Sequence, residues 1–320
     1  MDIQLKDKMP GRFLAERAVE APGGIVLMLD RFLGSGLDEE VFKIRGCSSQ
    51  CVPLRHPAYQ DVARAPIIFR IRPQDADLIG LALEAGLLEQ NDHALEAANG
   101  LAVSGWLETD APLDALARHL AGRMEQRSGG HGKAGLFRFA DRRVLELAWE
   151  VFDATQKSIL FGPIHSWHII DRRGQLKSLN RPALENSPGR SQPALRISPQ
   201  QLFELNQCQQ IQEMLRGWQS IVKELPSDYL GQARSAINNA ISIGAFENQD
   251  VLLLAAYTLQ IHPRLASHPK VRALVRRSIE EQTPLMSVLA EIPDPDGWER
   301  IKSDLNGVGA PKHSFEAAIN

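Results

Sequence analysis

Residues 135–174 have the sequence GLFRFADRRVLELAWEVFDATQKSILFGPIHSWHIIDRRG. The aromatic-rich run at 136–139 is typical of a short strand. Asp141 follows at the N-cap position of a helix predicted over 141–156, where a carboxylate accepts hydrogen bonds from the free amides of the first turn. Apolar residues recur at helical spacing through 141–156. This half of the stretch therefore predicts a strand followed by a capped amphipathic helix with one apolar face.

The second half of the stretch predicts two more strands and a hairpin turn. Residues 159–161 and 164–170 are apolar runs of strand type, and Gly162-Pro163 separates them. The sequence DRRG at 171–174 is typical of a turn.

Strand-like and helix-like segments alternate through the first 178 residues. Apolar runs at 25–29, 67–71 and 101–107 predict strands, and helical periodicity appears at 75–90 and 112–126. Alternation of this kind predicts an α/β lobe over residues 1–178, built on a mixed sheet with covering helices.

The periodicity changes beyond this lobe. Prolines and polar residues at 179–197 predict a linker. A capping box with proline at the first helical position, 198–201, starts a helix predicted to continue to Leu225. Further helices are predicted at 230–241, 251–261, 269–279 and from 283. We therefore expect an all-α lobe over 198–292, arranged as a compact bundle, and a loosely held tail over 293–320.

Composition excludes several classes of protein. The chain has 320 residues with 43% hydrophobic residues and a net charge of −3, so it lacks the basic excess of a nucleic-acid-binding protein. The longest apolar run, 251–261, is shorter than the ~20 residues of a membrane helix and predicts a buried helix. Residues 1–10 are polar, unlike a signal peptide, and the three cysteines suit a reducing compartment. We expect a cytoplasmic protein.

Five motifs resemble those of a known family, the type VI secretion adaptors or effector chaperones. Residues 137–145, FRFADRRVL, are similar to its "F-R-F-x-D-P-R-V-L" segment, and residues 161–167, FGPIHSW, to its "F-G-P-x-x-x-W" segment. Upstream, 27–30 resembles its "L-L-D" strand, 65–71 its "A-P-x-L" strand, and 113–124 its "L-x-x-H-L" helix. The motifs occur in the family's order.

The resemblance implies a chaperone that binds a secreted toxic effector non-covalently and loads it onto the spike protein of the type VI secretion system. Such a protein needs no cofactor, metal or catalytic residue. Arg142 stands where the family usually has proline, which is favourable but not required at a first helical position. The motif positions carried over as partner-binding or structural residues are Asp30, Arg138, Asp141, Arg143, Gly162, Pro163 and Trp167.

Charged residues within and beyond these motifs suggest specific contacts. Asp30 closes an apolar strand, so buried Asp30–Arg138 or Asp141–Arg143 pairs are predicted, and the cost of breaking a buried pair favours a structural role. On the helix predicted at 269–279, three arginines form a basic patch that is either a solvated face or a docking surface for an acidic partner: Arg272, Arg276 and Arg277.

Two other motifs carry weak chemical signals. Cys47, Cys51 and His56 lack the fourth ligand of a structural zinc site, so we expect loop cysteines without metal. The glycine-rich segment 128–135 departs from a phosphate-binding loop in its glycine spacing, its final residue and its predicted flanking elements. We expect a flexible connection there.

Two alternatives to the chaperone remain open. One is a hydrolase or transferase on the α/β lobe with His119, His165 or His168 as the base, although no nucleophile-elbow or zinc-protease motif is present. On a strand, His165 and His168 point to opposite faces and cannot share an ion. The other alternative is a structural scaffold of the secretion apparatus. The oligomeric state is open as well.

Overall fold

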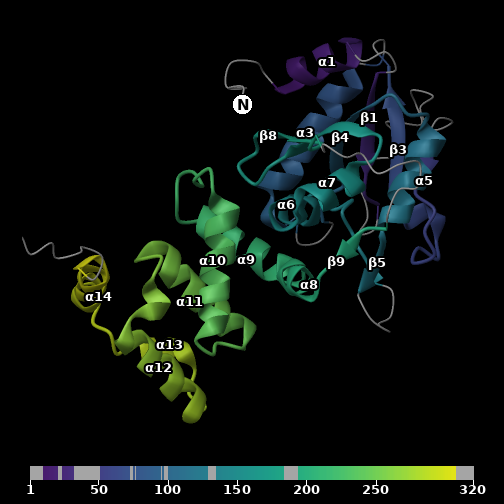
Figure 1. The fold of residues 1–320 in the computed structure, drawn as a ribbon. Coiled ribbons are helices and arrows are strands. Elements are labelled where there is room, and N and C mark those ends of the chain that lie inside the picture. The colour runs from purple at the N-terminus through teal and green to yellow at the C-terminus, as the bar shows by residue number, and fades with distance from the viewer. Residues whose placement is uncertain are drawn as a thin grey trace, which may run out of the picture. The chain divides into compact units, whose positions relative to one another are not determined.

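The computed structural model describes residues 10–20, 24–31, 51–72, 75, 77–94, 96, 100–128, 135–183 and 194–307. The chain forms two compact units, Met1–Cys208 and Gln209–Asn320. The first unit is built on a β-sheet and the second is helical, as Figure 1 shows. The predicted fold class, an α/β lobe followed by an all-α lobe, is confirmed.

A six-stranded sheet forms the centre of the first unit. In spatial order its strands are β2 (Val52–Pro53), β3 (Ile67–Ile71), β1 (Ile25–Leu29), β4 (Val103–Thr109), β7 (Ile164–Ile170) and β8 (Leu176–Asn180). Every neighbouring pair in this sheet is antiparallel, so the mixed sheet expected from the sequence is corrected for this sheet. The alternation of apolar runs and helical segments does not determine the direction of the strands. A parallel pairing occurs in a smaller sheet, between β5 (Glu125–Ser128) and β9 (Arg196–Ile197), with β6 (Gly135–Leu136) on the other side of β5.

Helices and aromatic side chains cover the two faces of the large sheet. On one face, α1 (Pro10–Glu20) and α3 (Asp77–Asn91) pack against the apolar side chains of β1. On the other, Trp167 of β7 lies edge-on to Phe139, with ring centroids 6.0 Å apart, and also contacts Phe161. Because side chains alternate along a strand, β7 contributes side chains to the core on both faces of the sheet.

The helix predicted over 141–156 and the strand predicted over 159–161 are corrected by the structure. Two helices occupy this region, α6 (Arg142–Val151) and α7 (Ala154–Phe161). Asp153 starts the second one with a capping box, in which its side chain accepts from the backbone of Gln156. An apolar run of three residues, such as 159–161, is compatible with either a strand or a helix. Here the cap at Asp153 starts a helix that continues through these residues.

The strand predicted at 136–139 is shorter in the structure. Only Gly135–Leu136 pair within the small sheet, as β6. Phe137 and Phe139 are nevertheless both buried and lie with ring centroids 5.6 Å apart. This segment therefore contributes to the core through its aromatic side chains more than through strand pairing.

The regular elements described in the second unit are helical. They are α9 (Cys208–Gln219), α10 (Tyr229–Ser242), α11 (Asn248–Gln260), α12 (Pro269–Glu280), α13 (Leu285–Leu289) and α14 (Asp296–Gly307). The helix predicted from 198 to 225 is interrupted at Gln207, so that α8 (Pro199–Asn206) packs against α6 in the first unit.

Part of the predicted loose tail is ordered as α14. This helix buries Trp298, Ile301 and Leu305, and the Trp298 ring stacks on Tyr257 of α11 at 4.6 Å between centroids. The apolar residues of α14 recur at helical spacing, so they form one face that packs against the rest of the unit. This packing explains why the segment is helical and not a loose tail.

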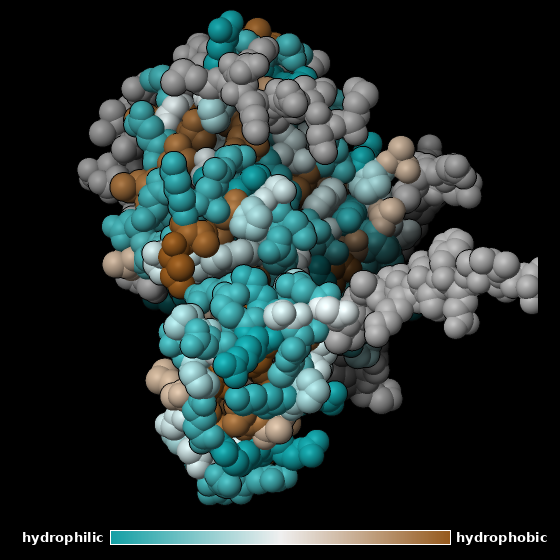
Figure 2. Space-filling model, turned by 90° about the vertical axis from the view of Figure 1, so that its left-hand side faces the viewer, coloured by the Kyte–Doolittle hydropathy of each residue, from teal (hydrophilic) through white to brown (hydrophobic). Residues whose placement is uncertain are grey.

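The surface mixes polar and apolar residues. On the face shown in Figure 2, hydrophobic patches are bordered by hydrophilic residues. Within the described ranges, no helix is both long and apolar enough to cross a lipid bilayer.

Removal of the α7 cap provides a test of this fold. We expect Asp153→Ala to destabilise α7 by about 1 kcal/mol, because the cap bond to Gln156 is lost. Hydrogen exchange of the amides in Ala154–Phe161 should accelerate roughly fivefold. Asp228→Ala is the matched control, since Asp228 precedes α10 without making a side-chain cap bond. If Asp228→Ala accelerated the exchange of the amides in Ala154–Phe161 as much as Asp153→Ala does, the role of the cap would be contradicted.

Candidate functional site

Both charge pairs expected from the sequence form in the first unit. Arg138 Nη2 donates to Asp30 Oδ2 at 3.0 Å. Arg143 binds Asp141 with two nitrogens, Nε to Oδ1 at 2.9 Å and Nη2 to Oδ2 at 2.7 Å. The Asp141 carboxylate also accepts from the backbone amide of Arg143 at 3.0 Å, so it caps α6 as predicted. Both aspartates are buried.

The second pair belongs to a larger group, here called the buried charge cluster: Glu96, Asp141, Arg143 and Arg172. Glu96 is 1% exposed and uses both carboxylate oxygens. Its Oε1 accepts from Arg143 at 3.0 Å, and its Oε2 accepts from Arg172 at 2.8 Å. Glu96 thereby connects the start of α6 to the turn that follows β7.

The arginines determine the ionisation of the two acids. Burial raises the pKa of Glu96, but the charges and hydrogen bonds of Arg172 and Arg143 outweigh it, and the pKa lies below its ordinary value. The pKa of Asp141 is likewise lowered, since burial is outweighed mainly by Arg143. All four groups of the cluster are therefore charged at neutral pH, and the cluster holds two charges of each sign.

Arg142, the first residue of α6, is also buried. Its guanidinium donates to the carbonyl oxygens of Val103 at 2.7 Å and Gly86 at 2.9 Å, and lies 3.4 Å from Glu89 Oε2. A Cβ on Gly86 would lie 3.5 Å from Arg142 Nη1 and 2.6 Å from Ile170 Cδ1. Glycine at 86 thus leaves room for the Ile170 side chain, and the hydrogen bonds of Arg142 join α6 to α3 and β4.

The remaining motif residues line the interior of the same unit. Gly162 has a positive φ of 53°, and a Cβ there would lie 2.2 Å from His119. His119 Nε2 donates to the Leu160 carbonyl oxygen at 2.8 Å. The Pro163 carbonyl accepts from a threonine hydroxyl of β4, and Trp167 is fully buried. These contacts hold the lobe together, and a role of the motif residues in partner binding stays a prediction.

The histidines considered as catalytic bases have separate surroundings. His165 is exposed and lies 3.0 Å from Asp110. His168 is buried, with Nδ1 at 2.8 Å from Ser178 Oγ and Nε2 at 2.8 Å from Glu108 Oε1. This hydroxyl–imidazole–carboxylate chain links β8, β7 and β4, and the sequence did not indicate it because its members are far apart along the chain.

The weak chemical motifs lie partly outside the described residues. No group of three or more histidine, cysteine, aspartate or glutamate side chains in the described ranges could hold a metal ion. Cys47 and residues 129–134 fall outside those ranges. The expectations for the loop cysteines and for the glycine-rich connection therefore stay predictions.

The predicted basic patch is present on α12 of the second unit. Arg272 and Arg276 are exposed. Arg277 is paired with Glu291 and lies 4.0 Å from Glu281. The patch is thus partly neutralised, and its role as a docking surface stays a prediction.

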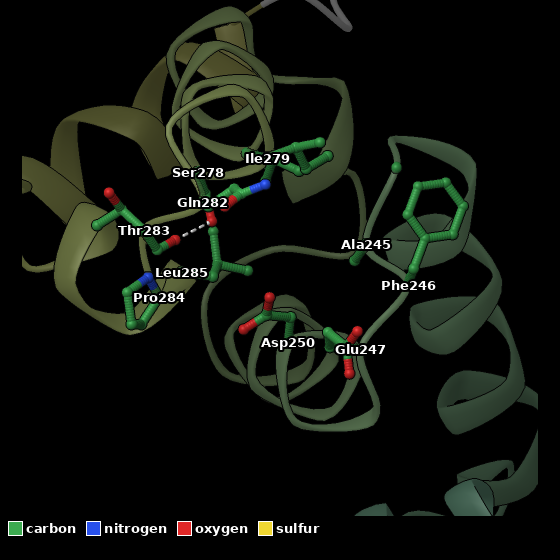
Figure 3. Close-up of a pocket in the computed structure, with 12 residues that line it drawn as sticks. Ala245, Phe246, Glu247, Asp250, Ser278, Ile279, Gln282, Thr283, Pro284 and Leu285 are labelled. Atoms are coloured by element: carbon green, nitrogen blue, oxygen red, sulfur yellow. Dashed lines mark hydrogen bonds between the residues drawn. The ribbon is translucent and has the colours of Figure 1, made fainter.

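Two cavities of the second unit were not predicted. The larger, about 540 Å³, lies between α9 and α11 and is here called the α9–α11 groove. The smaller, about 390 Å³, lies where α11 begins, opposite α12, and is here called the acidic pocket (Figure 3). Glu247 and Asp250 form one of its walls.

The sequence contained one signal for the groove. The run at 251–261 is apolar around the whole helix, which predicted complete burial. In the structure one face of α11 is buried, including Val251, Leu254 and Ala255, whereas Leu252 and Leu253 line the groove and are half-buried. A helix that is apolar on all sides either lies wholly in a core or forms the wall of a groove.

Comparison with known proteins gives one family match. Residues 27–158 match the family model described as "Domain of unknown function (DUF4123)". The match runs from β1 into α7 and includes Asp30, Glu96, Arg138, Asp141 and Arg143. No curated protein and no solved structure matches the chain. The second unit lies outside the match.

The cluster predicts how stability depends on pH. Glu96 and Asp141 have lowered pKa values in the folded state, so their contribution is complete above their unfolded values of about 4. It is lost as the pH falls through the folded values. We expect Glu96→Gln to reduce the free energy of unfolding at pH 7 by about 3 kcal/mol, because the buried Arg172 and the half-buried Arg143 lose their shared partner. The difference from the wild type should shrink towards pH 3.

Glu150→Gln is the matched control for that experiment. Glu150 is 42% exposed and lies 3.6 Å from Lys177, so its replacement should change the free energy of unfolding by less than about 0.5 kcal/mol. Urea denaturation between pH 7 and pH 3 measures both variants. A Glu96→Gln effect that is as small as the control, or that grows on acidification, would contradict the electrostatic role of the cluster.

Proposed function

We propose that this chain is a type VI secretion adaptor: a cytoplasmic chaperone that binds a toxic effector and loads it onto the spike protein. The observation that carries the proposal is the match of residues 27–158 to a domain family associated with such adaptors. The five family-like motifs support it; four lie within the matched residues and the fifth, at 161–167, follows just after them. The activity is reversible protein binding without covalent chemistry.

The division of the chain into two units suits this task. The match to the family lies within the sheet-based unit, whose motif residues are used in charge pairs and aromatic contacts. The helical unit carries two cavities and exposed apolar side chains, which are typical of surfaces that bind other proteins. We therefore assign scaffolding to the first unit and at least part of the partner contact to the second.

An enzyme on the first unit is the second candidate, favoured by the Ser178–His168–Glu108 chain. A hydroxyl bound to an imidazole that is in turn bound to a carboxylate is the arrangement of an activated nucleophile. His168 is only 2% exposed, and the ring of Phe13 lies edge-on to it at 5.4 Å. These contacts favour a structural link between strands. Labelling of the purified chain by a fluorophosphonate, and its loss in Ser178→Ala, would favour the enzyme instead.

Co-expression tests the adaptor proposal. The chain is produced in a heterologous host together with a toxin-like protein encoded by a neighbouring gene, which carries an inactivating mutation. We expect the toxin-like protein to be more soluble with the chain than without it, and to co-purify with it. Addition of the spike protein should give a ternary complex. The absence of both stabilisation and co-purification would contradict the proposal, and stoichiometric incorporation into the assembled apparatus would favour a scaffold.

A further inference from the structure

The α9–α11 groove has the shape of a binding site for a helix. One wall is a face of α11 whose residues recur every three or four positions along the helix: Gln249, Leu252, Leu253, Ala256, Leu259 and Gln260. Since α11 spans Asn248–Gln260, this wall is about 20 Å long. A partner helix of three to four turns would be matched to that length.

The opposite wall, on α9, contains a glycine that leaves the groove open. Met214 and Trp218 of α9 line this wall together with Ile221, which follows the helix, and Gly217 lies among them. A Cβ built on Gly217 meets no atom within 4 Å, so this part of the groove is free space. A glycine at such a position allows a partner's backbone to approach α9 closely.

The exposed apolar side chains of the second unit gather at the two cavities. Four large hydrophobic side chains of this unit are exposed in the described residues: Ile221 at 63%, Phe246 at 77%, Ile279 at 47% and Met286 at 67%. Ile221 and Met286 line the groove, and Phe246 and Ile279 line the acidic pocket. Apolar surface concentrated in this way indicates a protein-binding site.

The charge of both cavities has one sign. Among the described residues, the charged side chains that line them are all acidic: Glu213 in the groove, and Glu247 and Asp250 in the pocket. Figure 3 shows the two pocket carboxylates close together at the start of α11, with Phe246 to one side. Burial and the like charge of Glu247 raise the pKa of Asp250. A bound cation would relieve this repulsion.

We propose that the α9–α11 groove binds an amphipathic helix of the partner, apolar on one face and carrying lysine or arginine residues that reach Glu213 and the acidic pocket. The groove accepts the apolar face by the helix-in-groove mode, and the carboxylates select basic segments over acidic ones. This inference rests on the proposed function, since it names the class of effector or spike segment that the adaptor holds.

Gly217→Leu tests the groove without damage to the fold. The new side chain enters free space, and leucine is favoured over glycine within a helix by roughly 0.8 kcal/mol, so α9 should be no less stable. The matched control is Gly122→Leu on α5 of the first unit. Gly122 is also an exposed helical glycine with nothing within 4 Å of a built Cβ.

The probe is a synthetic, fluorescently labelled amphipathic helix of about 16 residues, with leucines on one face and lysines on the other. A second peptide carries glutamate in place of each lysine. By fluorescence anisotropy with the full chain, we expect the basic peptide to bind at least about tenfold more tightly than the acidic one. Gly217→Leu should weaken its binding by at least about tenfold, and Gly122→Leu should leave it unchanged.

Several results would overturn the inference. They are the absence of binding, equal binding of the two peptides, or binding that Gly217→Leu does not change. A change of oligomeric state in Gly217→Leu, measured by light scattering, would show that the groove is occupied by a second copy of the chain. If the peptide experiment fails while co-expression stabilises the toxin-like protein, the adaptor proposal stands and the partner is held elsewhere. If co-expression fails while the basic peptide binds, the adaptor proposal itself is wrong.

Discussion

Four ionised side chains meet inside the first unit, and their burial is possible only because each has a partner. Glu96 is the shared one: both of its oxygens are bound by arginines, one from α6 and one from the turn after β7. Asp141 completes the group while capping α6. Removing one member leaves an uncompensated buried charge, which costs more than the pair itself contributes. The cluster therefore fixes α6 relative to the turn after β7, and the motif segment 137–145 supplies two of its four members, Asp141 and Arg143.

Local signals in the sequence predicted much of this arrangement. Asp141 was recognisable as a cap from its position before an apolar helical pattern, and the alternation of segments predicted the α/β lobe. The part played by Glu96 could not be predicted, because the sequence does not reveal which distant residues a fold brings together. The three apolar residues at 159–161 were misassigned to a strand for a similar reason, since a run that short has no periodicity of its own. The α9–α11 groove depends on the spacing of two helices, which no local pattern encodes.

The two units differ in how their polar and apolar side chains are used. In the first, the polar motif residues form hydrogen bonds and ion pairs, and the aromatic ones pack in the core. These contacts stabilise the fold of the unit. In the second, apolar side chains such as Phe246 and Met286 stay exposed beside acidic ones, at a cost in solubility that a binding partner would offset. Arg142 belongs to the first unit and is held by hydrogen bonds to the carbonyl oxygens of Val103 and Gly86.

The most direct test of the adaptor function is an affinity purification of the tagged, full-length chain from its native cells while they express the secretion system, followed by mass spectrometry. The adaptor function predicts recovery of one toxin-like protein together with a spike component, both absent from an untagged control. Recovery of neither protein would contradict it and would direct attention to Ser178 and His168 as a catalytic pair.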